Sequence, residues 1–305
     1  MLVISHYSIF INLIINLNNM RKFKITSLGA LSFILSFGLF VSCQEQAVET
    51  IPEEPQEISS ETKAKFEELG FDISDIRMTD DTNLLDPASE GGNYILENDI
   101  IITPENLEAM LKSSIKHTGA VGEQYRTNNL VSSPRTISVI GYTGNNSNGL
   151  DNTMQTALQW AINNYNALNT GLTFTLSYGT NWPSFDMVVY RVNGGGGGSA
   201  GFPSGGDPYQ FIQIQSGTSS FGTNTTEHVI THEIGHAVGL RHTDYFNRSL
   251  SCGTGGNEGS GGVGAVYIPG TPSGFDANSV MLSCFSANED GEFGPFDVVA
   301  LEFLY

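Results

Sequence analysis

Eleven residues, HEIGHAVGLRH from His232 to His242, constrain this chain more than any other part of it. They begin inside a stretch, 225–238, whose composition predicts a helix with Thr225 as a candidate N-cap. Four residues advance a helix by just over one turn, so His232 and His236 project from the same face. The two imidazoles can therefore share one metal ion.

Gly239 follows this predicted helix directly. Glycine accepts positive φ at a helix end, so the chain can turn sharply there and bring His242 back as a third ligand. Three neutral imidazoles leave the fourth position of a zinc ion to water, as in catalytic rather than structural sites. Glu233, next to the first ligand, can reach that water without binding the metal, as a general base must. The alternative, a helix with unrelated histidines, does not account for three of the chain's six histidines at ligand spacing.

The motif resembles the HExxHxxGxxH signature of the metzincin zinc peptidases, in which a methionine-containing turn lies under the metal. The run Asn278-Ser279-Val280-Met281 matches that turn, and the resemblance implies that Met281 forms a hydrophobic floor beneath the histidines rather than a ligand. Together with HEIGHAVGLRHTD (232–244), IPGTP (268–272) and the ending DVVALEFLY (297–305), it resembles the bacterial dual-action HEIGH metallopeptidases.

The resemblance implies an α+β fold with a mixed twisted sheet, an active-site helix and the methionine turn, preceded by a small propeptide-like segment. Substrates would lie extended and antiparallel to an edge strand, for which residues 199–202 are the candidate. The implied activity is hydrolysis of internal peptide bonds in extracellular proteins, with one Zn²⁺, a zinc-activated water and Glu233 as base. The residue that would assist zinc at the oxyanion is not assigned, because Leu282-Ser283-Cys284 stands where some metzincins have a Tyr. The alternative class is a lipid-anchored binding module without turnover, although no ligand or base is missing.

The N-terminal residues predict export and a lipid anchor. Residues 20–42 combine a basic start, MRKFK, with an apolar run that ends before Cys43, and they resemble a bacterial lipoprotein signal peptide. Cleavage would leave Cys43 as a lipidated N-terminus; an uncleaved membrane anchor is the alternative. Residues 1–19 precede a complete signal peptide, so we expect the true start at Met20. An outer-membrane or cell-surface lipoprotein is expected, with a soluble secreted protein as the alternative.

The remaining cysteines and the charge fit the same location. Once Cys43 is lipidated, Cys252 and Cys284 would pair in a disulfide, which suits an oxidising compartment; two unpaired thiols are the alternative. The net charge of −19 argues against attraction to nucleic acid or to anionic lipid. Membrane contact is therefore expected only through the lipid, and the partners are protein or peptide substrates.

Composition divides the rest of the chain into three parts. Residues 43–64 are acidic and contain proline, which predicts a flexible tether. Residues 65–125 contain short apolar clusters and predict the propeptide-like segment, with a strand over 93–103 and a helix from Pro104. The composition then changes to few charges and much Gly, Asn, Ser and Thr, and we expect the catalytic domain over 126–305.

Two further residues near the metal motif invite a functional interpretation. Leu96-Glu97-Asn98-Asp99 loosely resembles the aspartate switch of the astacin branch of metzincins. By that resemblance Asp99 would occupy the water position on zinc until the segment is removed; an ordinary turn is the alternative. His228 lies one helical turn before His232, but a fourth histidine would close the site, so we expect it at the surface or behind the ligands.

Within the expected catalytic domain, hydrophobic periodicity predicts a helix over 152–166 and strands over 136–143, 172–178, 186–191 and 211–215. Five consecutive glycines, 194–198, precede the last of these strands. They predict either a flexible loop or a backbone that lies close to a bound peptide at the rim of a cleft.

Overall fold

The computed structural model describes residues 57–79, 85, 92–112, 124–260, 262–272 and 274–305. The chain divides into two units, 1–52 and 53–305, and every described residue belongs to the second. The predicted leader, Cys43 and most of the predicted tether therefore lie outside the described residues. No helix in the described ranges is both long and apolar enough to cross a lipid bilayer.

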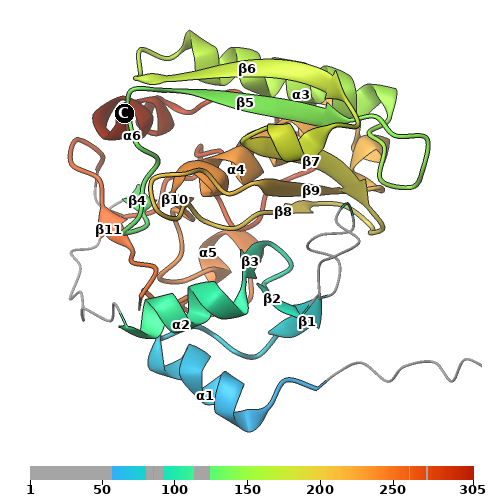
Figure 1. Ribbon diagram of the computed structural model, residues 1–305. Helices are drawn as coiled ribbons and strands as arrows, with labels where there is room; N and C mark the ends of the chain where they lie inside the picture. The colour runs from blue at the N-terminus through green and yellow to red at the C-terminus, as the bar shows by residue number, and fades with distance from the viewer. Residues whose placement is uncertain (1–56, 80–84, 86–91, 113–123, 261, 273) are drawn as a thin grey trace, which may run out of the picture. The chain divides into compact units, whose positions relative to one another are not determined.

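A five-stranded mixed sheet organises the C-terminal part of the chain (Figure 1). Its strand order is β6–β5–β7–β9–β8, in which the first four strands are parallel and β8 is antiparallel to β9 at one edge. The strands are β5 (Arg135–Tyr142), β6 (Leu172–Gly179), β7 (Met187–Val192), β8 (Gly198–Ser199) and β9 (Phe211–Gln215). The four predicted strands are confirmed to within a residue or so at each end, and the mixed sheet agrees with the expected α+β class.

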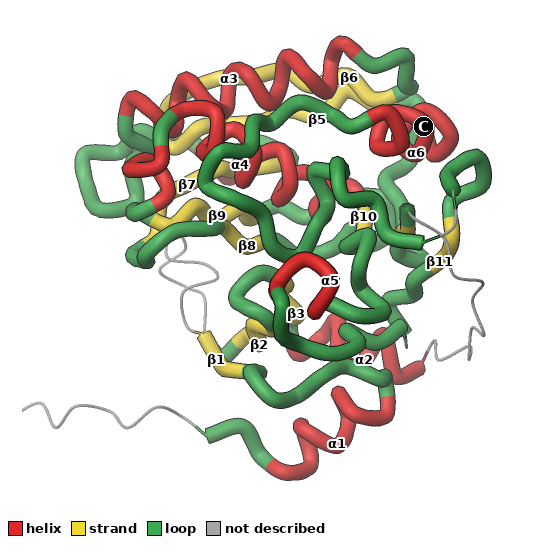
Figure 2. Tube along the Cα trace, turned by 180° about the vertical axis from the view of Figure 1, so that it is seen from behind, coloured by secondary structure: helices red, strands yellow, loops and turns green. Residues whose placement is uncertain are grey.

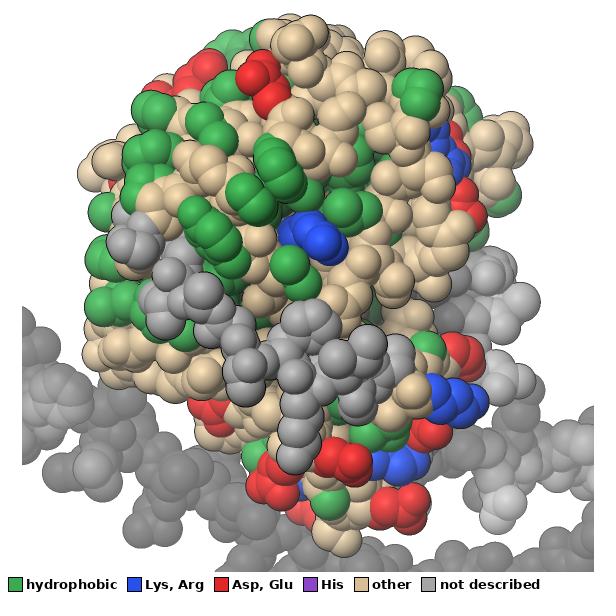
Figure 3. Space-filling model, turned by 90° about the vertical axis from the view of Figure 1, so that its left-hand side faces the viewer, with side chains coloured by type: hydrophobic (Ala, Val, Ile, Leu, Met, Phe, Trp, Pro, Cys, Tyr) green, Lys and Arg blue, Asp and Glu red, His purple; other side chains and the backbone are tan. Residues whose placement is uncertain are grey.

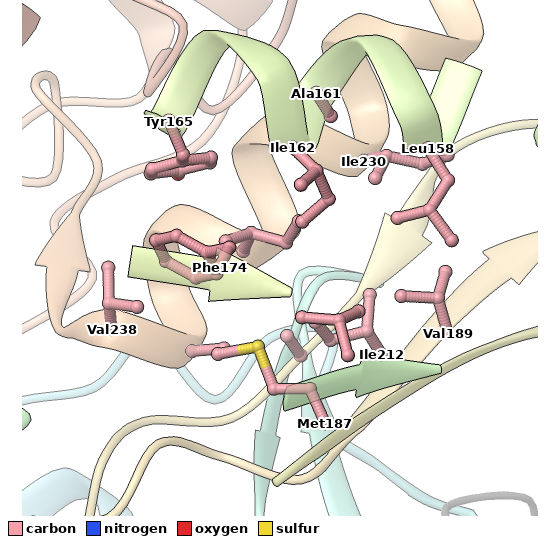
Figure 4. Packing of buried hydrophobic residues seen from close by; sticks show 14 of the residues in the cluster. Leu158, Ala161, Ile162, Tyr165, Phe174, Met187, Val189, Ile212, Ile230 and Val238 are labelled. Carbon is pink, nitrogen blue, oxygen red and sulfur yellow. The ribbon is translucent and has the colours of Figure 1, made fainter. Parts of the chain in front are cut away.

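Two long helices pack together against this sheet, α3 (Asn152–Ala167) and α4 (Thr223–Val238). Asp151 caps α3 by accepting a hydrogen bond from Met154 N at 2.9 Å, and the predicted apolar face of the helix is buried. Figure 4 shows this face meeting side chains from the sheet and from α4; the labelled residues are Leu158, Ala161, Ile162, Tyr165, Phe174, Met187, Val189, Ile212, Ile230 and Val238. This core fixes α4, and with it the metal motif, against the sheet.

Short strands and the C-terminal helix contact the C-terminal end of α4 and the residues that follow it. β4 (Tyr125–Arg126) lies between β10 (Leu240–Arg241) and β11 (Val266–Tyr267) in a small antiparallel sheet. The C-terminal helix α6 (Pro295–Leu304) brings the hydroxyl of Tyr305 to the carbonyl of Val238 at the last turn of α4. The remaining helical turns are η2 (Trp182–Ser184), η3 (Thr218–Phe221) and α5 (Ser249–Cys252).

The N-terminal segment consists of α1 (Ser60–Glu68), the antiparallel strands β1 (Arg77–Thr79), β2 (Asn93–Leu96) and β3 (Ile100–Ile102), and α2 (Pro104–Lys112). α2 begins at Pro104 as predicted. Figure 3 shows acidic and basic side chains close together at the lower end of one face, the end at which α1 lies in Figure 1. The segment buries its own apolar side chains together with Phe202 and Val263 of the C-terminal part.

Two predictions for this segment are wrong. The tether does not extend to residue 64, because Ser59 accepts a hydrogen bond from Thr62 N at 3.1 Å and starts α1 at Ser60. Residues 93–103 are not one strand but the hairpin β2–β3. Its turn is made by Glu97 and Asn98, whose φ angles of 61° and 62° reverse the chain.

Candidate metal centre

The three predicted histidine ligands meet at one point. The Nε2 atom of His242 lies 3.2 Å from that of His232 and 3.1 Å from that of His236, and all three side chains are buried. Tetrahedral zinc, with Zn–N bonds of about 2.0–2.1 Å, requires donor atoms roughly 3.3 Å apart. The nitrogen atoms are therefore spaced to hold one such ion.

The turn after α4 brings the third histidine into place as predicted. Gly239 has a φ of 115°, and its N–H donates to the carbonyls of Gly235 and His236 at the helix end. A Cβ at Gly239 would lie 2.8 Å from Leu130 Cδ2, so both the conformation and the space favour glycine. The other end of α4 differs from the prediction. The helix begins at Thr223, two residues before Thr225. Thr225 donates its hydroxyl to the carbonyl of Ala287 instead of acting as N-cap.

Each imidazole is oriented by a partner on its other nitrogen. His232 Nδ1 lies 2.8 Å from the carbonyl of Val280, and His236 Nδ1 lies 2.9 Å from the carbonyl of Leu240. A carbonyl can only accept, so both Nδ1 atoms carry the proton and both Nε2 atoms are left with a lone pair that can bind a metal ion. His242 uses a carboxylate, Glu258, for the same purpose.

Glu258 is a site residue that the sequence did not reveal. Its carboxylate is buried and contacts His242 Nδ1, Arg241 Nη2 at 3.2 Å and Ser283 Oγ at 2.9 Å. Although burial opposes it, the positive charge of His242 and Arg241 holds the pKa of Glu258 well below its ordinary value. A carboxylate that stays ionised behind a metal-binding histidine fixes the ring and strengthens it as a ligand. The only sequence signal was a lone acid in a glycine-rich stretch.

Glu233 lies beside the histidines and is almost completely buried. Burial, and then the charge of Asp99 nearby, raise the pKa of Glu233 well above its ordinary value. The glycine run reaches this residue: a Cβ at Gly198 would lie 2.6 Å from Glu233 Oε1. Gly195 to Gly198 also line a cavity of about 400 Å³ together with His232 and Glu233. Of the two predictions for these glycines, the structure favours the rim of a cleft.

Asp99 is the fourth member of the histidine cluster. Its Oδ2 atom lies 2.8 Å from Nε2 of His242, 3.0 Å from Nε2 of His236 and 3.7 Å from Nε2 of His232. The four ligand atoms lie within 4.8 Å of one another. Burial opposes ionisation, but the charges of His236 and His232 hold the pKa of Asp99 well below its ordinary value. The carboxylate thus lies where a fourth ligand of a tetrahedral ion would lie.

Backbone pairing holds Asp99 in this position. Ala200 N donates to the carbonyl of Asp99 at 3.0 Å, and Ile101 N donates to the carbonyl of Ala200 at 2.9 Å. The hairpin β2–β3 thereby extends the sheet beyond β8, at the edge that the sequence placed at 199–202. Ile100 pairs with Ala200 in parallel, which is opposite to the direction implied for a substrate.

Met281 packs against the helix α4, which carries two of the three histidines. Its sulfur lies against Gly235, where a Cβ would approach it to 2.5 Å, and its carbonyl accepts a hydrogen bond from Thr243 N at 2.9 Å. The side chain is fully buried. The hydrophobic floor beneath the histidines that the resemblance implies for Met281 stays a prediction.

Three other residues that the sequence singled out lie near the site. Cys252 and Cys284 form a disulfide, which joins α5 to the residues that follow Met281. His228 is buried rather than at the surface: its Nδ1 lies 2.8 Å from the carbonyl of Asp290, and its ring lies 4.4 Å from that of Phe285. It stands apart from the metal-binding group, as expected. Burial lowers the pKa of His228 to about 4.

Residues 94–305 match the sequence model of the dual-action HEIGH metallo-peptidase family. The chain belongs to this family. A HEIGH metallopeptidase is a hydrolase with a catalytic metal and protein or peptide substrates, and the histidine cluster described above fits that chemistry. The match starts at Tyr94 and so covers the hairpin that carries Asp99 as well as the sheet and α4.

No curated protein matches this HEIGH metallopeptidase. Two solved structures are similar to it, described as "Structure of Myroilysin" and "Crystal structure of myroilysin". The first is 13% identical over 57% of this chain and 81% of its own, and the second is 14% identical over 58% and 86%, each with a TM-score of 0.38. These values are too low to carry an inference about activity.

Proposed function

We propose that this HEIGH metallopeptidase is the latent precursor of a zinc endopeptidase that cleaves proteins outside the cell. The observation that supports it most directly is the spacing of the three Nε2 atoms beside a buried Glu233. An all-histidine set with oriented rings is typical of catalytic zinc. His232, His236 and His242 would hold the ion, and Met281 would form the floor beneath it.

The residues around the ion divide the work of hydrolysis. Zinc bound there would lower the pKa of a water to about 7 and polarise the substrate carbonyl. Glu233 would take the proton of that water and deliver it to the leaving amine. Its burial raises its pKa, so that it can hold the proton between the two transfers. The N–H and C=O of Ala200, which pair with the hairpin in the latent chain, would align an extended substrate.

Latency would come from Asp99. Its carboxylate lies within 3.0 Å of two of the three ligand nitrogens and so competes with water for the fourth position. The parallel pairing of the hairpin adds to this, because the segment covers the substrate edge in a direction opposite to that implied for substrates. Removal of residues up to about 125 would open both the metal and the edge.

The proposed location outside the cell, with a lipid on Cys43, rests on the leader sequence and is supported by the Cys252–Cys284 disulfide. Mass spectrometry of the mature protein tests it. An acylated Cys43 at the N-terminus is expected, whereas a later, unmodified start would favour the soluble secreted alternative.

The peptidase proposal is tested on the full-length protein before and after the segment is removed. We expect about one zinc per chain by metal analysis, little cleavage of a broad peptide library by the intact chain, and extensive cleavage after removal. Glu233→Ala should keep the zinc and lose about 10²-fold or more of the activity. Asp99→Ala should raise the activity of the intact chain. A protein that binds zinc but cleaves nothing after removal would instead be a binding module.

A further inference from the structure

A second carboxyl group of the hairpin is buried in the C-terminal part of the chain. Glu97 Oε2 lies 3.0 Å from Nε of Arg248, with the two side chains only 4% and 16% exposed. Glu97 adopts a left-handed φ of 61°, a conformation that residues with a Cβ rarely adopt. This turn conformation places Glu97 beside Arg248 and Asp99 beside the three histidines.

Arg248 is positioned independently of the hairpin. Its N–H donates to the carbonyl of Gly256 at 2.9 Å, and its side chain packs over Gly255. It directly precedes α5, which the Cys252–Cys284 disulfide fastens near the metal centre. Figure 2 shows α5 beside the β2–β3 hairpin. Arg248 would therefore keep its place when the segment departs.

Once the hairpin has left, the cationic side chains around Arg248 outnumber the carboxylates. The ion pairs of Arg248 within the described residues are those to Glu97 and, at 3.9 Å, to Glu258. Glu258 is already engaged by Arg241 and His242. Burial and then the charge of the Glu258 carboxylate raise the pKa of Glu97 to about 9, against the opposing charges of His242 and Arg248. Without Glu97, two guanidinium groups would face a single carboxylate.

The strand directions indicate on which side of the scissile bond of a substrate Glu97 and Arg248 lie. β8 runs from Gly198 toward Ala200, and the hairpin runs parallel to it, so Glu97 lies on the Gly198 side of Asp99. A substrate that runs antiparallel to β8 would place the residues after the scissile bond on that same side.

We infer that Arg248 forms a subsite for an acidic side chain on the carboxyl-terminal side of the scissile bond, and that Glu97 fills this subsite in the latent chain. The inference rests on the proposed peptidase function and adds the class of substrate: proteins with Asp or Glu shortly after the cleaved bond. A guanidinium next to an otherwise satisfied carboxylate recognises a carboxylate better than the isosteric amide.

The test uses the full-length protein, folded with its segment in place and then activated by limited cleavage, which trypsin can perform after Lys112 or Lys116. Cleavage of a peptide library, read by mass spectrometry, should show acidic residues enriched within the first few positions after the cut. For a matched pair of synthetic substrates with Glu or Gln at that position, kcat/KM should differ by about tenfold or more. Arg248→Gln should reduce the ratio to near one, and Arg248→Lys should keep part of it.

Arg191→Gln is the matched control, because Arg191 lies on β7 and its Nε donates to the carbonyl of Ser147 on the exposed surface. It should leave the ratio unchanged. Equal cleavage of both substrates, or a ratio that survives Arg248→Gln, would overturn the inference while leaving the peptidase function intact.

A binding measurement keeps the two hypotheses separate if no substrate is cut, an outcome that counts against the peptidase function. The decapeptide of residues 93–102 and its Glu97→Gln version are titrated calorimetrically into the activated, zinc-loaded protein. About tenfold weaker binding of the Gln version, lost in Arg248→Gln, supports the subsite. Equal affinities refute it.

Discussion

Gly198 lies against the carboxylate of Glu233 with no space for a side chain between them. A Cβ at Gly198 would approach Oε1 of Glu233 to 2.6 Å and its Cγ to 2.7 Å. The backbone cannot easily retreat, because Gly198 pairs with Ile214 in the sheet and Glu233 is on a buried helix. The glycine run thus brings the substrate edge directly against the proposed base.

We expect Gly198→Ala to displace Glu233 and to lower kcat/KM of the activated enzyme about 10²-fold, since misplacement of a catalytic group by about 1 Å has effects of this size. Zinc content should not change. Gly195→Ala, in the same run but with nothing within 4 Å of its added carbon, should retain activity. Equal losses in the two variants would show that the run matters for flexibility rather than for this contact.

Glu258→Gln should weaken zinc binding by about 10- to 100-fold, because the amide cannot hold His242 as an ionised carboxylate does. Competition with a chelator of known affinity measures the change. Glu289→Gln, at an exposed acid, is the control. Unaltered affinity in Glu258→Gln would mean that Arg241 and Ser283, rather than His242, are the reason for this buried charge.

Gly262→Ala should weaken latency. The added carbon would collide with Cβ of Met110 on α2, which packs against this glycine. The intact chain should therefore show more peptidase activity than wild type. Gly205→Ala is a close control, because its φ of 63° resembles the 59° of Gly262 and nothing lies within 4 Å of its added carbon. Latency that is unchanged in Gly262→Ala would argue that α2 does not help to hold the hairpin.

Stability should depend on pH through His228. Burial lowers its folded pKa to about 4, below its value of about 6.5 in the unfolded chain. Its contribution is therefore fully present above pH 6.5 and is lost as the pH falls toward 4, by about 3 kcal/mol in total. Denaturant unfolding at several pH values should show that His228→Asn, which can keep the bond to Asp290, loses less free energy of unfolding over this range. Parallel curves for the two proteins would refute the assignment.

The sequence was most informative where local geometry decides the outcome. Helical spacing and one glycine suffice to bring His232, His236 and His242 together, and alternation of apolar residues predicts the strands. The hairpin turn was missed because Glu97 and Asn98 adopt positive φ without a glycine to signal it. Contacts made across long sequence separations left no local trace: Asp99 is 137 residues from His236 and was suggested only by resemblance. Glu258 and Arg248 lie outside helices and strands, where no hydrophobic periodicity predicts which way a side chain points.

The Asp99 oxygen among the three histidine nitrogens also bears on the order of events during maturation. A newly folded chain would offer an incoming ion four donors of its own, the nitrogens of three buried histidines and one oxygen of Asp99. The ion would then bind before the site is opened. The N-terminal segment would supply one ligand, the Asp99 carboxylate, until proteolysis removes the segment and water takes the place of that ligand. A protease that matures in this order would bind its metal while it is still latent and cannot yet cleave other proteins.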